Sequence, residues 1–226
     1  MNDKEYFHDD LREDPYEEPC EEPTLTEKTD KYVPYVTYTL LAVNVIAFAV
    51  CTFTGNLLYN KGAFGVDYLT GWDQIYRFVT SMFLHINVMH LSGNMIMLLA
   101  AGPVIEKNCG RIFFTILYFL SGIGGNLLSA LWDIASGEHY ISVGASGAVM
   151  GIVGALAVCV IAHRGRFKEF NLPRMLLMIV YIFYSGLTTE KVNNMAHFGG
   201  IFVGSVITLL YELIVGSGKR KAGDNA

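Results

Sequence analysis

The chain has 226 residues, of which 52% are hydrophobic and only 16% are charged, and its mean hydropathy is +0.37. This composition is too apolar for an ordinary water-soluble domain, and it predicts an all-α integral membrane protein. We expect transmembrane proteins and the lipid bilayer as partners, and no nucleic acid.

The first 31 residues differ from the rest of the chain. Residues 1–31 hold twelve of the 21 acidic residues and four of the 16 basic residues. A segment rich in Asp, Glu and Pro, with almost nothing to bury, cannot offset the entropy of ordering, so it predicts a disordered, solvated cytoplasmic arm. It lacks the basic and apolar regions of a signal peptide, so we expect the first membrane helix to direct insertion.

Six apolar stretches follow, each near the length of about 20 residues that crosses a hydrocarbon core as a helix. Backbone polar groups in lipid must be satisfied inside the protein, so these stretches are predicted to be helices and not isolated strands. We predict a six-helix membrane domain over residues 32–216 and a short basic cytoplasmic tail over 217–226. The predicted spans are Pro34–Phe53, Met89–Ile105, Ile112–Trp132, Ser146–His163, Leu172–Leu187 and Ala196–Val215.

The distribution of Lys and Arg predicts how these helices are oriented. An even number of spans puts both termini on one side, and the connecting segments of that side carry eleven Lys and Arg residues against three on the other. Both termini are therefore predicted to be cytoplasmic. The first outer connection, about residues 54–84, is unusually long, as functional loops often are. The N-terminus does not resemble a transit peptide, which favours a bacterial plasma membrane.

Polar and ionisable residues enter three of the predicted helices from the outer side. His85, His90 and Asn94 accompany the second span, Ser146 opens the fourth, and His197 enters the sixth. Such residues are costly in a membrane and indicate a functional site. Because all three helices begin at the outer face, the five side chains are predicted to share one shallow layer.

Ser146 lies in Gly144-Ala145-Ser146-Gly147, at a junction between a loop and a helix. Flanking glycines permit a tight turn that exposes the hydroxyl and leaves N–H groups of the first helical turn available to an oxyanion. By itself this motif is equally consistent with helix packing in a membrane. His197 favours catalysis, because a neutral imidazole can take the hydroxyl proton and return it to a leaving amine.

Small residues recur at four-residue spacing on the fourth and sixth helices, which allows two backbones to approach closely. We expect these glycines to act through packing, by bringing Ser146 and His197 together. The residues are Gly147, Gly151 and Ala155 on one helix and Gly200 and Gly204 on the other.

His90 and Asn94 are four residues apart, so they share one helix face, whereas His85 is about 140° away from His90 around the helix. We predict that His90 and Asn94 donate hydrogen bonds to the oxyanion. A metal site built from the three histidines would lack a nearby carboxylate or thiolate, so we predict no metal and no other cofactor. The four cysteines show no paired spacing and receive no function.

No carboxylate stands close to His197 in the sequence. The nearest is Glu190, seven residues earlier in an outer connection. The predicted catalytic unit is therefore a dyad of Ser146 and His197, without the acid that orients the base in a triad.

Taken together, these motifs resemble the rhomboid family of intramembrane serine proteases over about residues 34–215. His85, His90 and Asn94 are spaced as in the family's H-x-x-x-x-H-x-x-x-N. The other matching motifs are the GASG run at Ser146, Ala196-His197-Phe198-Gly199-Gly200 with the family's G-x-x-x-G, the pair Tyr76-Arg77, and the turn Glu106-Lys-Asn-Cys-Gly110.

The resemblance implies a six-helix rhomboid-like bundle that cleaves transmembrane segments of other membrane proteins near the outer face. Ser146 and His197 would form the dyad, His90 and Asn94 would flank the oxyanion, and His85 and Arg77 would anchor the outer loop. The chain departs from the family at Met150, where an aromatic residue often stacks on the histidine, and at Thr208, where alanine is frequent.

Two other functions stay open. A catalytically silent rhomboid-like protein would bind membrane clients, although such proteins typically lose the serine or histidine that this chain keeps. A transporter or channel would carry ionisable residues at the bilayer midplane or paired repeats with broken helices. The oligomeric state has no signal in the sequence.

Overall fold

The computed structural model describes residues 32–55, 57–163, 178 and 193–223. Within these ranges the chain forms helices and no strand. Four helices, α1, α4, α5 and α8 up to Val215, are long and apolar enough to cross a membrane, and α6 is apolar but has 17 residues. The five long elements are α1 (Tyr35–Phe53), α4 (Val88–Cys109), α5 (Arg111–Ser136), α6 (Ser146–Ala162) and α8 (Asn194–Gly223).

These helices confirm the prediction of an all-α, polytopic membrane protein. Each corresponds to one of the predicted spans. The predicted fifth span, apart from Met178, and the predicted acidic arm lie outside the described residues. Helix α8 continues to Gly223, through most of the segment predicted as a basic tail.

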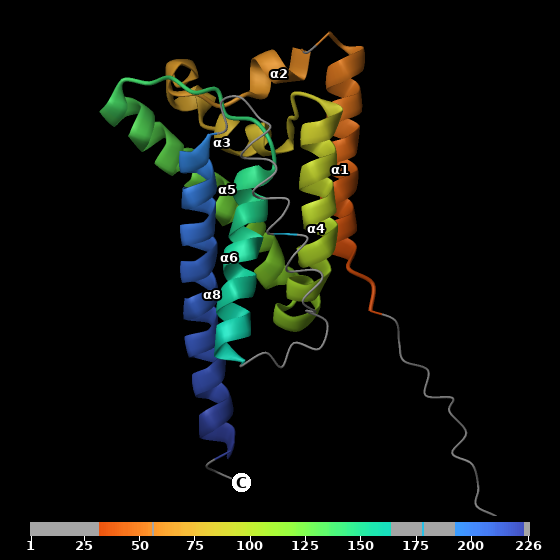
Figure 1. Ribbon diagram of the computed structural model, residues 1–226, viewed down its shortest axis with the longest axis vertical. Coiled ribbons are helices and arrows are strands. Elements are labelled where there is room, and N and C mark those ends of the chain that lie inside the picture. The colour runs from red at the N-terminus through yellow and green to blue at the C-terminus, as the bar shows by residue number, and fades with distance from the viewer. Residues whose placement is uncertain (1–31, 56, 164–177, 179–192, 224–226) are drawn as a thin grey trace, which may run out of the picture. The chain divides into compact units, whose positions relative to one another are not determined.

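Helix α6 is the central element of the described bundle. It packs against α4, α5 and α8, and Figure 1 shows it beside α8. The side chains of Ile152 and Cys159 are fully buried, and Leu156 is almost so. A helix of 17 residues that is apolar on all sides is typical of a core helix or a membrane span.

Helix α4 extends four residues beyond its predicted end at Ile105. The apolar run stops at Glu106 and Lys107, which is why hydropathy ends the helix too early. The helix itself ends at Gly110, whose φ of 93° lies in a region that residues with a side chain rarely adopt. This sharp turn leads directly into α5.

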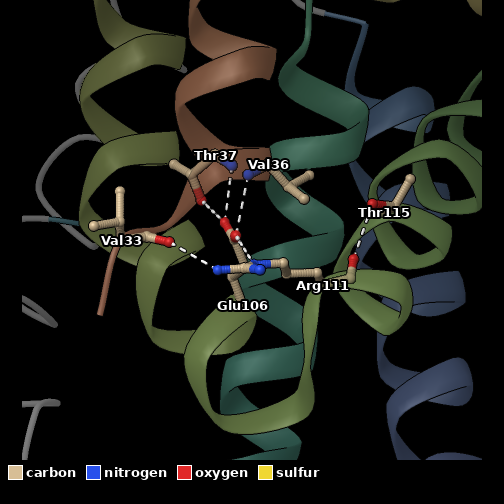
Figure 2. A network of polar contacts seen from close by, with 6 residues as sticks. All are labelled: Val33, Val36, Thr37, Glu106, Arg111 and Thr115. Atoms are coloured by element: carbon tan, nitrogen blue, oxygen red, sulfur yellow. Dashed lines mark hydrogen bonds and ion pairs between the residues drawn. The ribbon is translucent and has the colours of Figure 1, made fainter. Parts of the chain in front are cut away.

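Buried Glu106 joins α4 to the start of α1, as Figure 2 shows. Its carboxylate accepts hydrogen bonds from the backbone N–H groups of Val36 and Thr37, at 3.0 and 2.8 Å, and from the Thr37 hydroxyl at 2.8 Å. The first N–H groups of a helix lack partners within the helix, and its N-terminal end favours negative charge. Arg111, 3.8 Å from the carboxylate, offsets part of that charge.

The outer connection between α1 and α4, predicted only as a long loop, folds into short helices. They are α2 (Leu57–Gly62), η1 (Val66–Tyr68), η2 (Trp72–Gln74), α3 (Arg77–Thr80) and η3 (Ser81–Phe83). The Arg77 guanidinium donates to the Ala63 carbonyl at 2.8 Å and to Gln74 at 2.8 Å, so it ties together distant parts of this connection.

A second group of polar contacts ties the connection to α5 and to the segment before α6. Asn126 of α5 donates to the Phe78 carbonyl and to the Ser81 hydroxyl, and it accepts from Ser142, each at 3.0 Å. Ser142 also forms an isolated antiparallel bridge with Phe64. The four residues that lead into Ser146 are thereby anchored on two sides.

Candidate active site

Ser146 is the first residue of α6 and is half-buried. The turn before it depends on Gly144, whose φ of 117° would be strained for any residue with a side chain. The N-cap residue, Ala145, has no side chain that can satisfy the first N–H groups of α6. Those donors, and the positive end of the helix, therefore lie beside the serine hydroxyl.

The rings of His85 and His90 lie against the turn that precedes Ser146. A Cβ atom at Gly144 would come within 2.6 Å of the His90 ring, so only glycine lets that ring approach. The ring centroids of the two histidines are 5.1 Å apart, with an edge-to-face arrangement. Nε2 of His85 is 3.5 Å from the N–H of Ala145, which donates to it.

His85 precedes α4 and is buried. Burial, and secondly the neighbouring His90, lowers the pKa of His85 from 6.5 to about 3. The ring is therefore neutral near pH 7, and only a neutral ring has a nitrogen that can accept the Ala145 N–H.

Asn94 lies one turn after His90 on α4 and is buried. Its amide donates one hydrogen bond to the His90 carbonyl at 2.9 Å. A side-chain amide has two N–H donors, so a second remains for another acceptor. Asn87 caps α4 by accepting from the His90 N–H at 2.8 Å, which fixes the first turn of this helix.

Helices α6 and α8 touch through glycine backbones on the side where Ser146 and His197 lie. A Cβ atom at Gly200 would collide with the carbonyl of Gly147, and one at Gly204 with the carbonyl of Gly151. Ser146 lies one residue before Gly147 on α6. His197 lies about one turn before Gly200 on α8. On α4, the ring of His90 lies against Gly144, two residues before Ser146. The contacts gather all three helices around one location.

Asn193, which was not predicted from the sequence to be a site residue, fixes the start of α8. The Asn193 side chain accepts from the N–H of Ala196 at 3.1 Å and donates to the Ser129 hydroxyl of α5 at 2.6 Å. A Cβ at Gly125 would come within 2.5 Å of the Ala196 carbonyl, so α5 and α8 are also in close contact there. An Asn directly before an apolar helix is an N-cap signal that could have identified this residue.

The two departures from the family pattern lie on these same helices. Met150 is half-buried on α6, one turn after Ser146. Thr208 is buried on α8 and donates its hydroxyl to the Gly204 carbonyl at 2.8 Å, so its extra polar group is satisfied within its own helix.

A cavity of about 330 Å³ lies away from Ser146, between α1 and the outer connection. Its lining includes Ala47, Lys61 and Tyr76.

Comparison with known proteins identifies the family. The rhomboid domain model matches residues 72–213. The chain is 36% identical over 158 residues to "Rhomboid-like protease 1" of Toxoplasma gondii, which covers 66% of this chain and 52% of that protein.

Two bacterial proteins are also similar. The chain is 30% identical over 182 residues to "Rhomboid protease AarA" of Providencia stuartii, covering 70% of this chain and 62% of the relative. It is 27% identical over 175 residues to "Rhomboid protease GluP" of Bacillus subtilis, covering 76% of this chain and 34% of that relative. The chain therefore spans between about a third and two thirds of the length of these relatives. From the domain match, the relatives and the helical fold, the chain belongs to the rhomboid family.

Proposed function

We propose that this protein is an intramembrane serine endopeptidase that cleaves transmembrane segments of other membrane proteins, with Ser146 as nucleophile and His197 as general base. The observation that carries the proposal is the backbone contact of Gly147 with Gly200, which draws together the helices that hold these two residues. Relatives named as rhomboid proteases give independent support.

In the first step, His197 takes the proton of the Ser146 hydroxyl as its oxygen attacks the scissile carbonyl. The same ring then gives the proton to the leaving amine, and an acyl-enzyme results. Water, activated by His197 in turn, releases the second product. The hydroxyl-to-imidazole hydrogen bond that this needs is one that enzymes often tighten only when substrate binds.

The tetrahedral intermediate carries a negative oxygen that requires donors. The Ser146 N–H, at the uncapped start of α6, is one candidate. The ring of His90 against Gly144 and the remaining N–H of Asn94 are two more. Donors fixed in advance in a water-poor site stabilise developing charge more than water does.

A dyad needs some other way to hold the base in place. Asn193 caps α8 and bonds to Ser129, and Ala196 lies tightly against Gly125, so the backbone that carries His197 is held from two sides. This backbone restraint would replace part of the orientation that a carboxylate gives in a triad.

The substrate is proposed to be a helical membrane segment that unwinds locally, since an intact helix hides its carbonyl groups from a nucleophile. Cleavage is proposed near the outer face of the plasma membrane, with both termini of this protein in the cytoplasm. The start of α6 would face outward in that orientation.

The test compares purified wild-type protein with Ser146→Ala and His197→Ala variants on a helical membrane substrate in proteoliposomes. We expect each variant to lower cleavage by roughly 10³-fold or more, with unchanged thermal stability. Equal cleavage by all three proteins would contradict the dyad. No cleavage by the wild type of several substrates that it nevertheless binds would favour a client-binding protein.

A further inference from the structure

A group of metal-binding side chains lies at the other end of α6, far from Ser146. Cys109 at the end of α4, Cys159 near the end of α6 and Glu212 of α8 bring their sulfur and oxygen atoms within 4.8 Å of one another. Thirteen residues separate Ser146 from Cys159, or about 20 Å along the helix. This cluster is therefore separate from the proposed catalytic site.

Both cysteines are buried, with exposed fractions of 9% for Cys109 and 0% for Cys159, and the Glu212 side chain is 15% exposed. A carboxylate at this depth is costly to keep charged, and so is a thiolate, unless a cation compensates for the lost hydration. Two sulfurs and a carboxylate are a donor set suited to Zn²⁺.

The spacing fits such an ion. Zinc binds sulfur at about 2.3 Å and carboxylate oxygen at about 2.0–2.2 Å, so tetrahedral ligands lie about 3.5–3.8 Å apart. The Cys159 sulfur is 3.9 Å from Oε1 of Glu212, and the remaining ligand distances are at most 4.8 Å. Shortening the longest of these distances by about 1.0–1.3 Å at most would close the site around an ion.

His163 completes the surroundings of the carboxylate. It follows Cys159 by four residues, and its Nε2 is 3.1 Å from both oxygens of Glu212. A hydrogen-bond partner of this kind orients a ligating carboxylate and raises metal affinity. The His163 side chain is 43% exposed, which provides an approach for the ion from this end of the helices.

Contacts beside the cluster hold α8 against the end of α4 and the start of α5. The Tyr211 hydroxyl donates to the Cys109 carbonyl at 3.2 Å, and the Tyr211 ring lies 4.3 Å from that of Phe113. Gly110 ends α4 directly after Cys109. These contacts restrain the backbone of Cys109 and the turn of α8 that carries Glu212.

We propose that Cys109, Cys159 and Glu212 form a zinc site that joins α4, α6 and α8 at the end of the bundle opposite Ser146, with His163 positioning the carboxylate. Each thiol releases a proton to solvent as it binds. Because α6 and α8 also carry Ser146 and His197, the ion would hold together the same two helices whose contact the proposed reaction needs.

The test uses the full chain in detergent micelles, purified without a histidine tag, reduced, freed of metal with a chelator and titrated with Co²⁺ as a spectroscopic substitute for Zn²⁺. We expect one equivalent to bind, with a thiolate-to-cobalt charge-transfer band and the strong visible absorption of tetrahedral Co²⁺, and Zn²⁺ to displace it. We also expect Zn²⁺ to raise the unfolding midpoint by several degrees.

The Cys109→Ala/Cys159→Ala variant should lose the charge-transfer band and the thermal shift. Glu212→Gln and His163→Ala should each weaken binding by about 10–100-fold while the protein keeps its fold. The matched control is Cys51→Ala, which removes another buried cysteine outside the cluster and should bind Co²⁺ like the wild type.

Three outcomes would overturn the proposal. The first is that wild-type protein binds no stoichiometric Co²⁺. The second is that the double variant binds it as the wild type does. The third is that thiol counting and mass measurement on protein isolated without reductant find Cys109 and Cys159 joined as a disulfide, which would make the pair a covalent link instead of a metal site.

Discussion

At the scale of single residues, the proposed reaction depends on the donors that stabilise the negative charge on the oxyanion of the tetrahedral intermediate. The proposed oxyanion donors His90 and Asn94 belong to α4, the proposed nucleophile begins α6, and the proposed base belongs to α8. In the proposed mechanism, separate helices thus supply the side-chain donors, the nucleophile and the base. Each contribution can therefore be removed by itself.

Replacing His90 with alanine should lower kcat and kcat/KM together by about 10²–10³-fold, because a donor that acts only on the oxyanion stabilises only the transition state. Asn94→Ala should act in the same direction. Steady-state kinetics on a quenched peptide or membrane substrate would measure both constants. A rise in KM at unchanged kcat would instead assign His90 to substrate binding. Ile86→Ala, at an exposed position four residues before His90, is the control.

Some of this site could be predicted from the residues alone. Ser146, His197, His90 and Asn94 stand out because polar groups are rare in apolar helices. Asn193 was missed because its effect comes from a cap and from a partner, Ser129, that is 64 residues away. An N-cap can be recognised from the local sequence. Ser129 becomes the partner of Asn193 only because α5 packs on α8.

At the scale of helices, close backbone approach is the feature that the proposed mechanism requires most. Gly200 lies against the carbonyl of Gly147, and Gly204 against that of Gly151, so two successive turns of α6 and α8 touch without side chains between them. This arrangement is typical of small-residue contacts between membrane helices.

Gly200→Ala should separate the two helices, lower stability by about 1–3 kcal/mol and reduce cleavage more than binding, because even a methyl group has no space there. Thermal unfolding in detergent and the cleavage assay would measure the two effects. Ala157→Val adds atoms to an exposed face of α6 and is the matched control. Wild-type activity in Gly200→Ala would show that the close contact is dispensable.

Glu106→Gln should destabilise the protein by about 2 kcal/mol while leaving the proposed catalytic groups intact. The neutral amide still accepts hydrogen bonds, but it loses the charge that suits the start of α1, and its NH₂ group faces N–H donors. Unfolding midpoints would test this. Asp73→Asn removes a carboxylate from an exposed position of η2 and should change stability little. Equal stabilities would mean that Glu106 does not stabilise the start of α1 through its charge.

The helices themselves were largely predictable, because length and hydropathy suffice for membrane spans. The end of α4 was not predictable, because a charged residue such as Glu106 normally marks the end of an apolar span. In the structure, three hydrogen-bond donors of α1 allow the Glu106 carboxylate to be buried. The cluster of Cys109, Cys159 and Glu212 was missed for a similar reason. Its members are about 50 residues apart, so no spacing motif marks them, and only the packing of three helices brings them together.

At the scale of the whole molecule, the orientation in the membrane would decide on which side the products of the proposed cleavage are released. The Lys and Arg count predicts that the α4–α5 turn lies in the cytoplasm and the α5–α6 connection outside. Lys107, in the last turn of α4, and Glu138, between α5 and α6, are both exposed.

Cysteines introduced at these two positions, in a Cys20→Ser background, should react differently with a membrane-impermeant maleimide. In intact cells we expect labelling of Glu138→Cys and not of Lys107→Cys, and labelling of both once the cells are permeabilised. The native Cys51, Cys109 and Cys159 are buried, which keeps the background low. The reverse pattern would invert the proposed orientation and move the start of α6 to the cytoplasmic side.

The central claim is that Ser146, activated by His197, is the nucleophile of a membrane-embedded protease. A fluorophosphonate probe, which modifies an activated serine, tests it most directly when the modified residue is mapped by mass spectrometry. We predict one adduct, on Ser146, formed by wild-type protein in membranes, and its loss in a folded His197→Ala variant. Cleavage activity without an adduct on Ser146, or an adduct that forms equally well without His197, would contradict the account.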